Sequence, residues 1–271
     1  MNLIAGERYR GCICIVILLL SLVIPLQPVA VEAQNRITTS GVLADNETWS
    51  GRIHITGDVV VPRGITLTVQ PGTVITFTPN SSDNDVKISV LEELGLNKCN
   101  LIVKGNLRVE GERNNKVLLG GVPGDFKWQA PIIWAGILFE GTNASSVIKH
   151  SEIRYALVAL VFSGSSTPRI VNTLIADNDV GIVTFDFSSP QITASRIEKN
   201  TLWGISCYDH SFPLLSQNTI KDSEVGVGCE DSSFPIIEYN RFGDNSVDIL
   251  IQHRSNPETE GNIFDDTSEG I

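Results

Sequence analysis

The sequence has few of the side chains that bind soft metals or build disulfide-rich folds. Met1 is the only methionine, and the four histidines are widely spaced along the chain. Only Cys99, Cys207 and Cys229 follow the N-terminal apolar run, and none of the three belongs to a CxxC pair. Three cysteines are too few for a fold that depends on disulfides, and their spacing does not match a zinc site.

Basic side chains are also scarce. The sequence has 20 lysines and arginines and 31 aspartates and glutamates, which gives a formal net charge of −11. An acidic surface repels phosphates, so the composition excludes nucleic acid and anionic membranes as partners. It is compatible with cation binding or with solubility alone. The chain is 42% hydrophobic, so it has enough apolar residues for a sizeable core.

The N-terminus resembles an export signal. Arg8 and Arg10 precede a long apolar run, and Val31 and Ala33 provide small residues at a cleavage site. We therefore expect residues 1–33 to be a signal peptide, cleaved near Ala33, with a retained anchor as the alternative. The mature chain would be secreted, periplasmic or on the cell surface, with no membrane contact beyond the signal segment.

The C-terminal half lacks any helical stripe and instead repeats a short unit. Prolines recur at intervals of 22 or 23 residues, at Pro168, Pro190, Pro213, Pro235 and Pro257. Apolar residues keep a fixed offset from each proline, as in the column Ile170, Ile192, Leu215 and Ile237. Short apolar alternations broken by Asn, Gly, Ser and Pro predict strands joined by turns. Such a unit buries its apolar side only when stacked as a solenoid. A leucine-rich repeat is the weaker alternative, because the unit leaves no room for a helix.

These repeats carry a family resemblance. The segments "PQITASRIEKN", "PLLSQNTIKDS" and "PIIEYNRFGDN" resemble coils of right-handed parallel β-helix proteins of the pectin-lyase-like superfamily. The stretch "GRIHITGDVVVPRGITLTVQPGTVITF" resembles the opening of many secreted members. The resemblance covers about residues 50–266 and implies an all-β, single-stranded parallel β-helix with coils of about 22 residues. It does not define a function, because one fold supports many activities.

The chain is predicted to have four parts. The signal peptide occupies residues 1–33, and an N-terminal cap with the first coils occupies residues 34–79. Residues 80–99 interrupt the repeat and are predicted to form a covering insertion with a short helix. Residues 100–271 form the parallel β-helix coils. The covering role is favoured over a substrate lid, because the open end of a β-helix is an exposed strand edge.

Two repeated positions are predicted to point into the core. Cys207 and Cys229 occupy the same position in successive coils, next to Ile205, so they should be neighbours inside the solenoid. They form either a disulfide or a stacked pair of buried thiols. Asn218, Asn240 and Asn262 occupy another repeated position, where stacked amides can hydrogen-bond the turn backbone, so their role is structural.

A third repeated position is the candidate functional site. Asp186, Asp209, Asp231 and His253 each lie four residues before a proline, and His210 follows Asp209. The preceding residues include Phe185, Tyr208 and Glu230. In the pectin-lyase-like superfamily such a face commonly forms a carbohydrate groove. The predicted ligand-binding residues are Phe185, Asp186, Tyr208, Asp209, His210, Glu230, Asp231 and His253.

Several roles are open for this strip. Aspartate near a turn commonly satisfies backbone N–H groups, which is the structural interpretation. Calcium bound by Asp186, Asp209 and Asp231 is a second hypothesis. A third is catalysis by Asp209 and His210. The family patterns expected of a lyase or a polygalacturonase are missing. A copper-maturation β-helix is a further family alternative, although soft ligands are nearly absent.

The sequence therefore favours a secreted, non-catalytic β-helix module that binds a polysaccharide or another cell-surface component, or acts as an envelope scaffold. The alternative is a polysaccharide lyase or glycoside hydrolase that acts along the Asp186, Asp209 and Asp231 strip. No cofactor other than calcium is suggested.

Overall fold

A computed structural model describes residues 36–78, 100–120, 133–142 and 145–265. All of them belong to one compact unit, Gln34–Ile271. The predicted signal peptide, the covering insertion and short helix expected at 80–99, and Cys99 lie outside the described residues.

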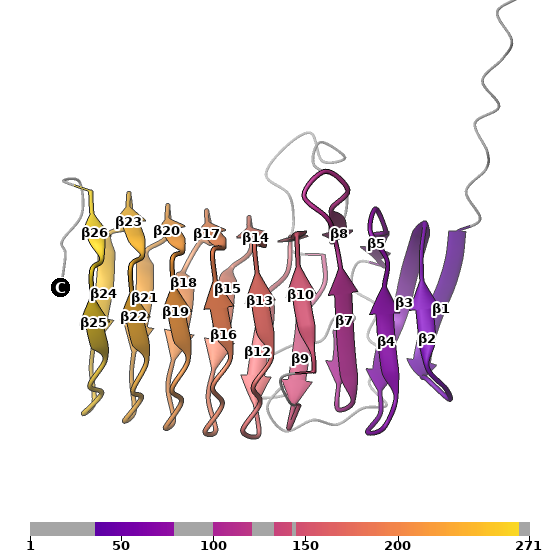
Figure 1. Ribbon diagram of the computed structural model, residues 1–271, viewed down its shortest axis with the longest axis horizontal. Helices are drawn as coiled ribbons and strands as arrows, with labels where there is room; N and C mark the ends of the chain where they lie inside the picture. The colour runs from indigo at the N-terminus through magenta and orange to yellow at the C-terminus, as the bar shows by residue number, and fades with distance from the viewer. Residues whose placement is uncertain (1–35, 79–99, 121–132, 143–144, 266–271) are drawn as a thin grey trace, which may run out of the picture. The chain divides into compact units, whose positions relative to one another are not determined.

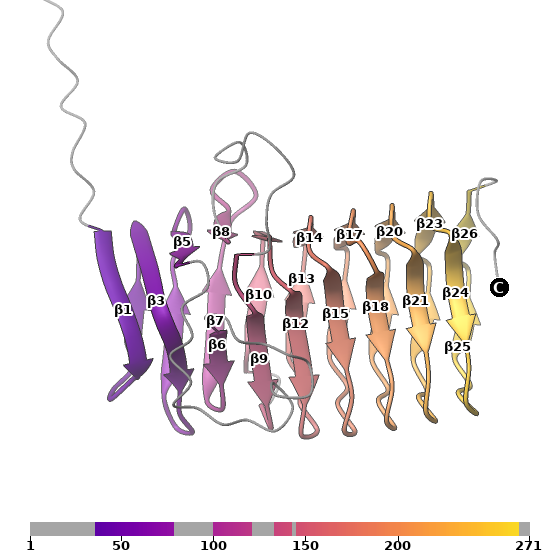
Figure 2. The same cartoon turned by 180° about the vertical axis from the view of Figure 1, so that it is seen from behind.

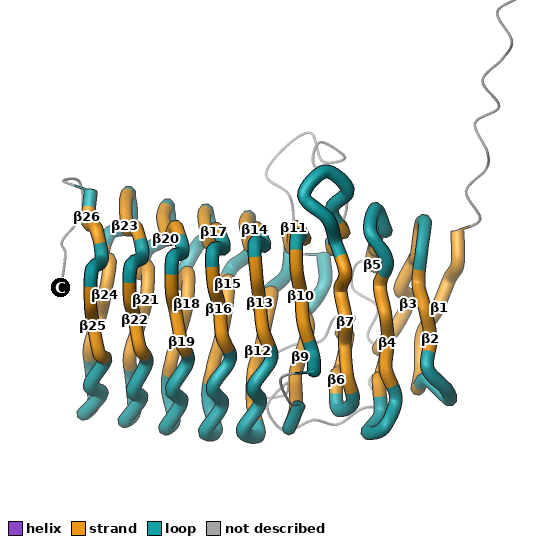
Figure 3. The backbone as a smooth tube through the Cα atoms, viewed as in Figure 1, coloured by secondary structure: helices purple, strands orange, loops and turns teal. Residues whose placement is uncertain are grey.

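The described residues form a parallel β-helix, as the repeat predicted, and none of them is in an α-helix. Successive coils stack beside one another along a common axis (Figure 1). Among these residues, no helix has the length and apolar character needed to cross a membrane. Each regular coil contributes one strand to each of three parallel ladders. Turns join the ladders at the corners of the coil (Figure 3).

The first ladder is the nine-stranded sheet. Its strands are β2 (Glu47–Trp49), β4 (Thr66–Val69), β7 (Asn106–Glu110), β10 (Val147–Lys149), β13 (Arg169–Val171), β16 (Gln191–Thr193), β19 (Leu214–Ser216), β22 (Ile236–Glu238) and β25 (Glu258–Glu260).

The second ladder begins with residues 36–39 of β1 (Arg36–Val42), which pair with the N-terminal part of β3, the longest strand. Its strands are β3 (Arg52–Val61), β5 (Val74–Phe77), β8 (Val117–Leu119), β11 (Ser151–Arg154), β14 (Leu174–Ala176), β17 (Arg196–Glu198), β20 (Thr219–Lys221), β23 (Arg241–Gly243) and β26 (Ile263–Phe264).

The third ladder faces the viewer in Figure 2. Besides the C-terminal parts of β1 and β3, its strands are β6 (Asn100–Val103), β9 (Gly136–Glu140), β12 (Val158–Ser163), β15 (Val180–Thr184), β18 (Trp203–Cys207), β21 (Val225–Cys229) and β24 (Val247–Ile251). Strand β3 pairs with β5 through its first half and with β6 through its second half, which joins the second and third ladders into one sheet.

The core consists of the apolar columns that the repeat predicted. Ile170, Ile192 and Leu215 are register partners in the first ladder, and each is fully buried. Ile182 and Ile205 are equivalent partners in the third ladder. Burying each aliphatic side chain contributes about 1.5–3 kcal/mol relative to leaving it in water, so the stack of coils, not the single coil, is stable.

Stacked amides close the corner between the first and second ladders. The Asn218 Nδ2 atom donates to the Ile192 carbonyl at 2.8 Å and to Asn240 Oδ1 at 3.0 Å. Its Oδ1 atom accepts from the Ser195 backbone N–H at 2.9 Å. Asn178 and Asn200 form a second such stack at the next corner. The structural role predicted for the asparagine column is confirmed.

The third ladder also buries an outward-facing column. Val60, Ile102, Leu138, Val161 and Val183 alternate with the inward residues, and each is at most 8% exposed. They form a second apolar cluster, which continues along the turn to Phe185 and Tyr208. The candidate site therefore begins where this apolar column ends.

Candidate functional site

The turns between the third and first ladders form the face on which the candidate residues lie. We call residues 185–188, 208–211, 230–233 and 252–255 the turn face. In each of these turns, two successive residues have positive φ, for example Asp209 at 46° and His210 at 58°. The Ser211 N–H closes its turn by donating to the Tyr208 carbonyl at 3.2 Å. This conformation is a type I′ turn.

The turn conformation explains why aspartate recurs. Aspartate tolerates the left-handed region better than most residues, and Asp186, Asp209 and Asp231 all occupy the first left-handed position. The Asp186 carboxylate also accepts from the Gly164 N–H of the preceding coil at 3.0 Å, as expected for a residue that satisfies a backbone donor. Asp209 instead contacts Nδ1 of its neighbour His210 at 3.1 Å.

Two aromatic pairs stack along the axis of the solenoid. The rings of Phe185 and Tyr208 lie 5.1 Å apart and 3° from parallel. The rings of Phe187 and His210 lie 5.1 Å apart with 22° between their planes. The next turn places Glu230 and Ser232 at these positions, so both stacks end. One face of each of the Tyr208 and His210 rings is therefore directed towards the following turn.

A shallow groove of about 590 Å³ lies beyond these ring faces. Its walls are made by Tyr208, Asp209, His210, Asp231, Ser232, His253 and Arg254. The groove is polar and accessible, because the Asp209 and His210 side chains are about half exposed, and those of Asp231 and His253 are 66% exposed. His253 Nδ1 lies 3.8 Å from Asp231 Oδ1. The groove thus combines carboxylates, imidazoles, a phenol and a guanidinium group.

The structure brings together five of the eight predicted ligand-binding residues in this groove. The other three lie outside it: Phe185 is buried beneath Tyr208, Asp186 is bonded to the preceding coil, and Glu230 is not part of the wall. Ser232 and Arg254 line the groove but were not predicted to bind a ligand. The repeat could have identified both residues as part of the site, because Ser232 and Arg254 occupy the position of His210 in the next two coils.

The predicted calcium ligands do not converge. Asp186, Asp209 and Asp231 belong to successive turns, and Asp186 has its own backbone partner. Within the described ranges, no group of three or more His, Cys, Asp or Glu side chains is placed to hold a metal ion. The calcium hypothesis therefore gains no support from this arrangement.

The two core cysteines are register partners, as the repeat indicated. Cys207 and Cys229 pair across β18 and β21, both are fully buried, and both are free thiols. Burial raises the pKa of Cys207 to about 12. Burial, followed by the neighbouring Cys207 and Glu230, also raises the pKa of Cys229. Of the two alternatives, the structure has the stacked thiols.

The fold and its turn face define the class of protein. The stacked coils of about 22 residues, with their inward aliphatic and asparagine columns, make this protein a parallel β-helix. Residues 114–271 match the family model described as "Periplasmic copper-binding protein (NosD)". This match spans more than half of the chain, so the chain belongs to the NosD family, a parallel β-helix family of the pectin-lyase-like superfamily. Searches of curated proteins and of solved structures found no match.

Proposed function

We propose that this protein is an exported, non-catalytic β-helix module that binds a polysaccharide through the groove on the turn face. In this proposal the N-terminal segment directs export and is cleaved near Ala33. The observation that supports binding is the pair of ring faces, on Tyr208 and His210, beside the carboxylates of Asp209 and Asp231. A sugar ring packs its C–H face on an aromatic ring, and its hydroxyls donate to carboxylates.

A non-catalytic role suits the exposure of the acidic groups. Glycoside hydrolysis requires one carboxylic acid that a largely apolar setting keeps protonated, opposite a second carboxylate. The Asp209 and Asp231 side chains are 50% and 66% exposed to water. A lyase or hydrolase that uses Asp209 and His210 is the alternative, and the binding experiment has an outcome that reveals it.

The experiment is a glycan array probed with the labelled protein, followed by affinity measurements on any glycan retained. We expect Tyr208→Ala to weaken binding roughly tenfold, since ring stacking adds about 0.5–1.5 kcal/mol to the loss of buried area. Tyr239→Ala is the matched control, because Tyr239 is 53% exposed at a different corner of the coil. Failure to bind any glycan would contradict polysaccharide binding and favour the scaffold role.

The same glycans also test the enzyme alternative. Release of shorter oligosaccharides by the wild-type protein, abolished in an Asp209→Asn, His210→Ala double variant, would replace the binding proposal with the catalytic one. Retention of intact glycan by the wild-type protein supports the non-catalytic module.

Copper binding is a second candidate, favoured by the family description and by the two His–Asp pairs in the groove. Imidazole and carboxylate groups are suitable Cu(II) ligands, whereas the thiols that Cu(I) prefers are buried in the core. The donor types of His210 and His253 therefore fit Cu(II). Their arrangement does not form a closed site, because no three candidate ligands converge in the described part of the chain.

A Cu(II) titration followed by electron paramagnetic resonance tests this second candidate. We expect weak, exchangeable binding with a nitrogen-coupled signal that is lost in a His210→Ala, His253→Ala variant. His150→Ala is the control, because His150 lies at a different corner. The same signal in the double variant would exclude the groove as the copper site.

A further inference from the structure

A second cavity lies at another corner of the solenoid, between the first and second ladders. It has a volume of about 470 Å³, and its lining includes the cations of Arg113, Lys116 and Arg196 and the imidazole ring of His150. No carboxylate lines it among the residues that the structure describes. A group of basic side chains around one cavity is notable in a chain with a net charge of −11.

The cavity results from two local departures from the repeat. The connection between β7 and β8 spans residues 111–116, whereas His150 alone joins β10 to β11. Figure 1 shows the longer loop projecting beyond the neighbouring turns. This loop supplies Arg113 and Lys116. At the equivalent corner of a later coil, the left-handed position holds Ala194, a small residue that lines the cavity, whereas the larger Tyr239 occupies this position two coils further on.

Alanine at a left-handed position is unusual. Ala194 has a φ of 49°, where an asparagine or glycine is normally preferred, and the left-handed region costs roughly 1–2 kcal/mol for residues with a Cβ. Asn172 occupies the same position one coil earlier with a φ of 49°. The small side chain at this point keeps the cavity open towards Arg196.

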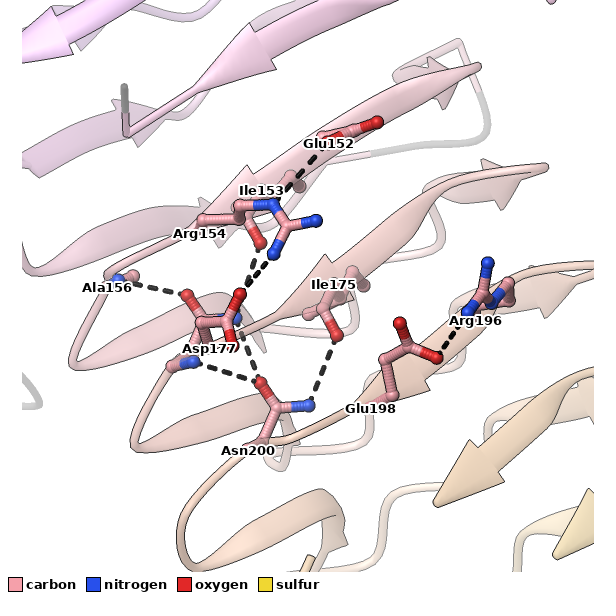
Figure 4. A network of polar contacts seen from close by, with 10 residues as sticks. Glu152, Ile153, Arg154, Ala156, Ile175, Asp177, Arg196, Glu198 and Asn200 are labelled. Carbon is pink, nitrogen blue, oxygen red and sulfur yellow. Dashed lines mark hydrogen bonds and ion pairs between the residues drawn. The ribbon is translucent and has the colours of Figure 1, made fainter. Parts of the chain in front are cut away.

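Two of the basic side chains form ion pairs with glutamates that are mostly shielded from solvent. Lys116 Nζ lies 2.9 Å from Glu152 Oε1, and Arg196 Nη2 lies 2.7 Å from Glu198 Oε2. The glutamate side chains are only 16% and 11% exposed, whereas those of Lys116 and Arg196 are 45% and 60% exposed. Figure 4 shows the ion pair of Arg196 with Glu198 and a second ion pair that Glu152 forms with Arg154. Each glutamate thus fixes its cation from the protein side.

The remaining donors are available to a ligand. A guanidinium group has five N–H donors, and the Arg196 contact with Glu198 uses one nitrogen. Arg113 forms no ion pair with any described residue. Burial acts to raise the pKa of Glu152, but the hydrogen bond and charge of Lys116 and the charge of Arg154 outweigh it and lower that pKa. The anchoring carboxylate is therefore ionised at neutral pH.

We propose that this cavity binds the oxyanion of a small ligand, a carboxylate or a phosphate on a molecule of monosaccharide size. The forked donors of Arg113 and Arg196 match the paired oxygens of such a group, and Lys116 adds a point charge. The volume lies within the usual range for small-molecule sites. The site is separate from the turn face and does not depend on the function proposed for that face.

Isothermal titration calorimetry at low salt tests the proposal with three probes: inorganic phosphate, glucuronate and glucose. We expect at least one anion to bind and glucose not to bind. Arg113→Gln and Arg196→Gln should each weaken anion binding roughly tenfold, which is the loss expected for one charge-assisted contact. Arg241→Gln is the matched control, because Arg241 occupies the register column of Arg196 two coils later and lies outside the cavity.

The two anions separate the sources of the ligand. Binding of phosphate alone indicates a phosphorylated ligand, binding of glucuronate alone indicates an acidic sugar, and binding of both supports the shared oxyanion chemistry. Absence of binding for both anions overturns the proposal. Binding that is unchanged in both the Arg113→Gln and Arg196→Gln variants overturns it as well. Arg113 lies in a loop, so its variant is expected to fold, which circular dichroism verifies.

Discussion

Replacing Asn218 by alanine tests whether the asparagine column holds the coils together. The Asn218 side chain is 2% exposed and links three coils. Its Oδ1 atom accepts from the Ser195 N–H at 2.9 Å, and its Nδ2 atom donates to the Ile192 carbonyl at 2.8 Å and to Asn240 Oδ1 at 3.0 Å. The alanine variant loses all three hydrogen bonds.

The expected cost is large for a single substitution. An unsatisfied buried donor such as the Ser195 N–H costs about 1–3 kcal/mol, and each lost hydrogen bond of Nδ2 about 1 kcal/mol more. We therefore expect Asn218→Ala to lower the free energy of unfolding by about 3–5 kcal/mol. Asn218→Ser is the matched control, because Ser195 occupies this position one coil earlier and its Oγ atom accepts from the Thr173 N–H at 3.1 Å. The serine variant should lose about 1–2 kcal/mol.

Equilibrium unfolding in urea, followed by both circular dichroism and tryptophan fluorescence, measures these differences. Coincident transitions by the two probes show that the coils unfold together, which is required before the free energies are compared. A loss below about 0.5 kcal/mol for Asn218→Ala, or equal losses for alanine and serine, would refute the role assigned to the column.

Three further predictions concern other parts of the solenoid. Alkylation mapped by mass spectrometry at pH 8 should leave Cys207 unmodified until the protein unfolds, because burial raises its pKa to about 12; rapid labelling of the folded protein would contradict this. Gly228→Val should destabilise the protein by more than about 2 kcal/mol in urea unfolding, since a Cβ at this position would overlap the ring of Trp203. Glu152→Gln should cost about 1 kcal/mol at pH 7 through the lost ion pair with Lys116. Because the pKa of Glu152 is lowered in the folded state, this difference should shrink as the pH falls below about 4.5, and a constant difference would argue against the pair.

The repeat made most of the fold predictable from the sequence. A column such as Ile182 and Ile205 is visible in the sequence because each member has the same local surroundings. The same reasoning placed Cys207 beside Cys229 and assigned the asparagines a structural role. It was less informative about Asp186, because the sequence does not show that a carboxylate bonds to the preceding coil.

Family membership was harder to derive from chemistry. The scarcity of soft ligands, with Met1 the only methionine, weighed against a copper-related family, yet the coils match that family over residues 114–271. A repeat is matched through the residues that build the coil. The repeated columns therefore define the fold and the family, whereas the proposed binding site consists of the few residues that depart from the repeat.

The sequence alone determined the coil length, the inward columns and the turns that carry Asp209 and His210. Only the tertiary structure decided that the Tyr208 and His210 rings each leave one face towards a groove, and that Arg113 meets Arg196 in a basic cavity. The physical reason is the range of the forces involved. A side chain's inward or outward direction follows from its local strand, but its neighbours follow from hydrogen-bonded register between coils that are distant in sequence.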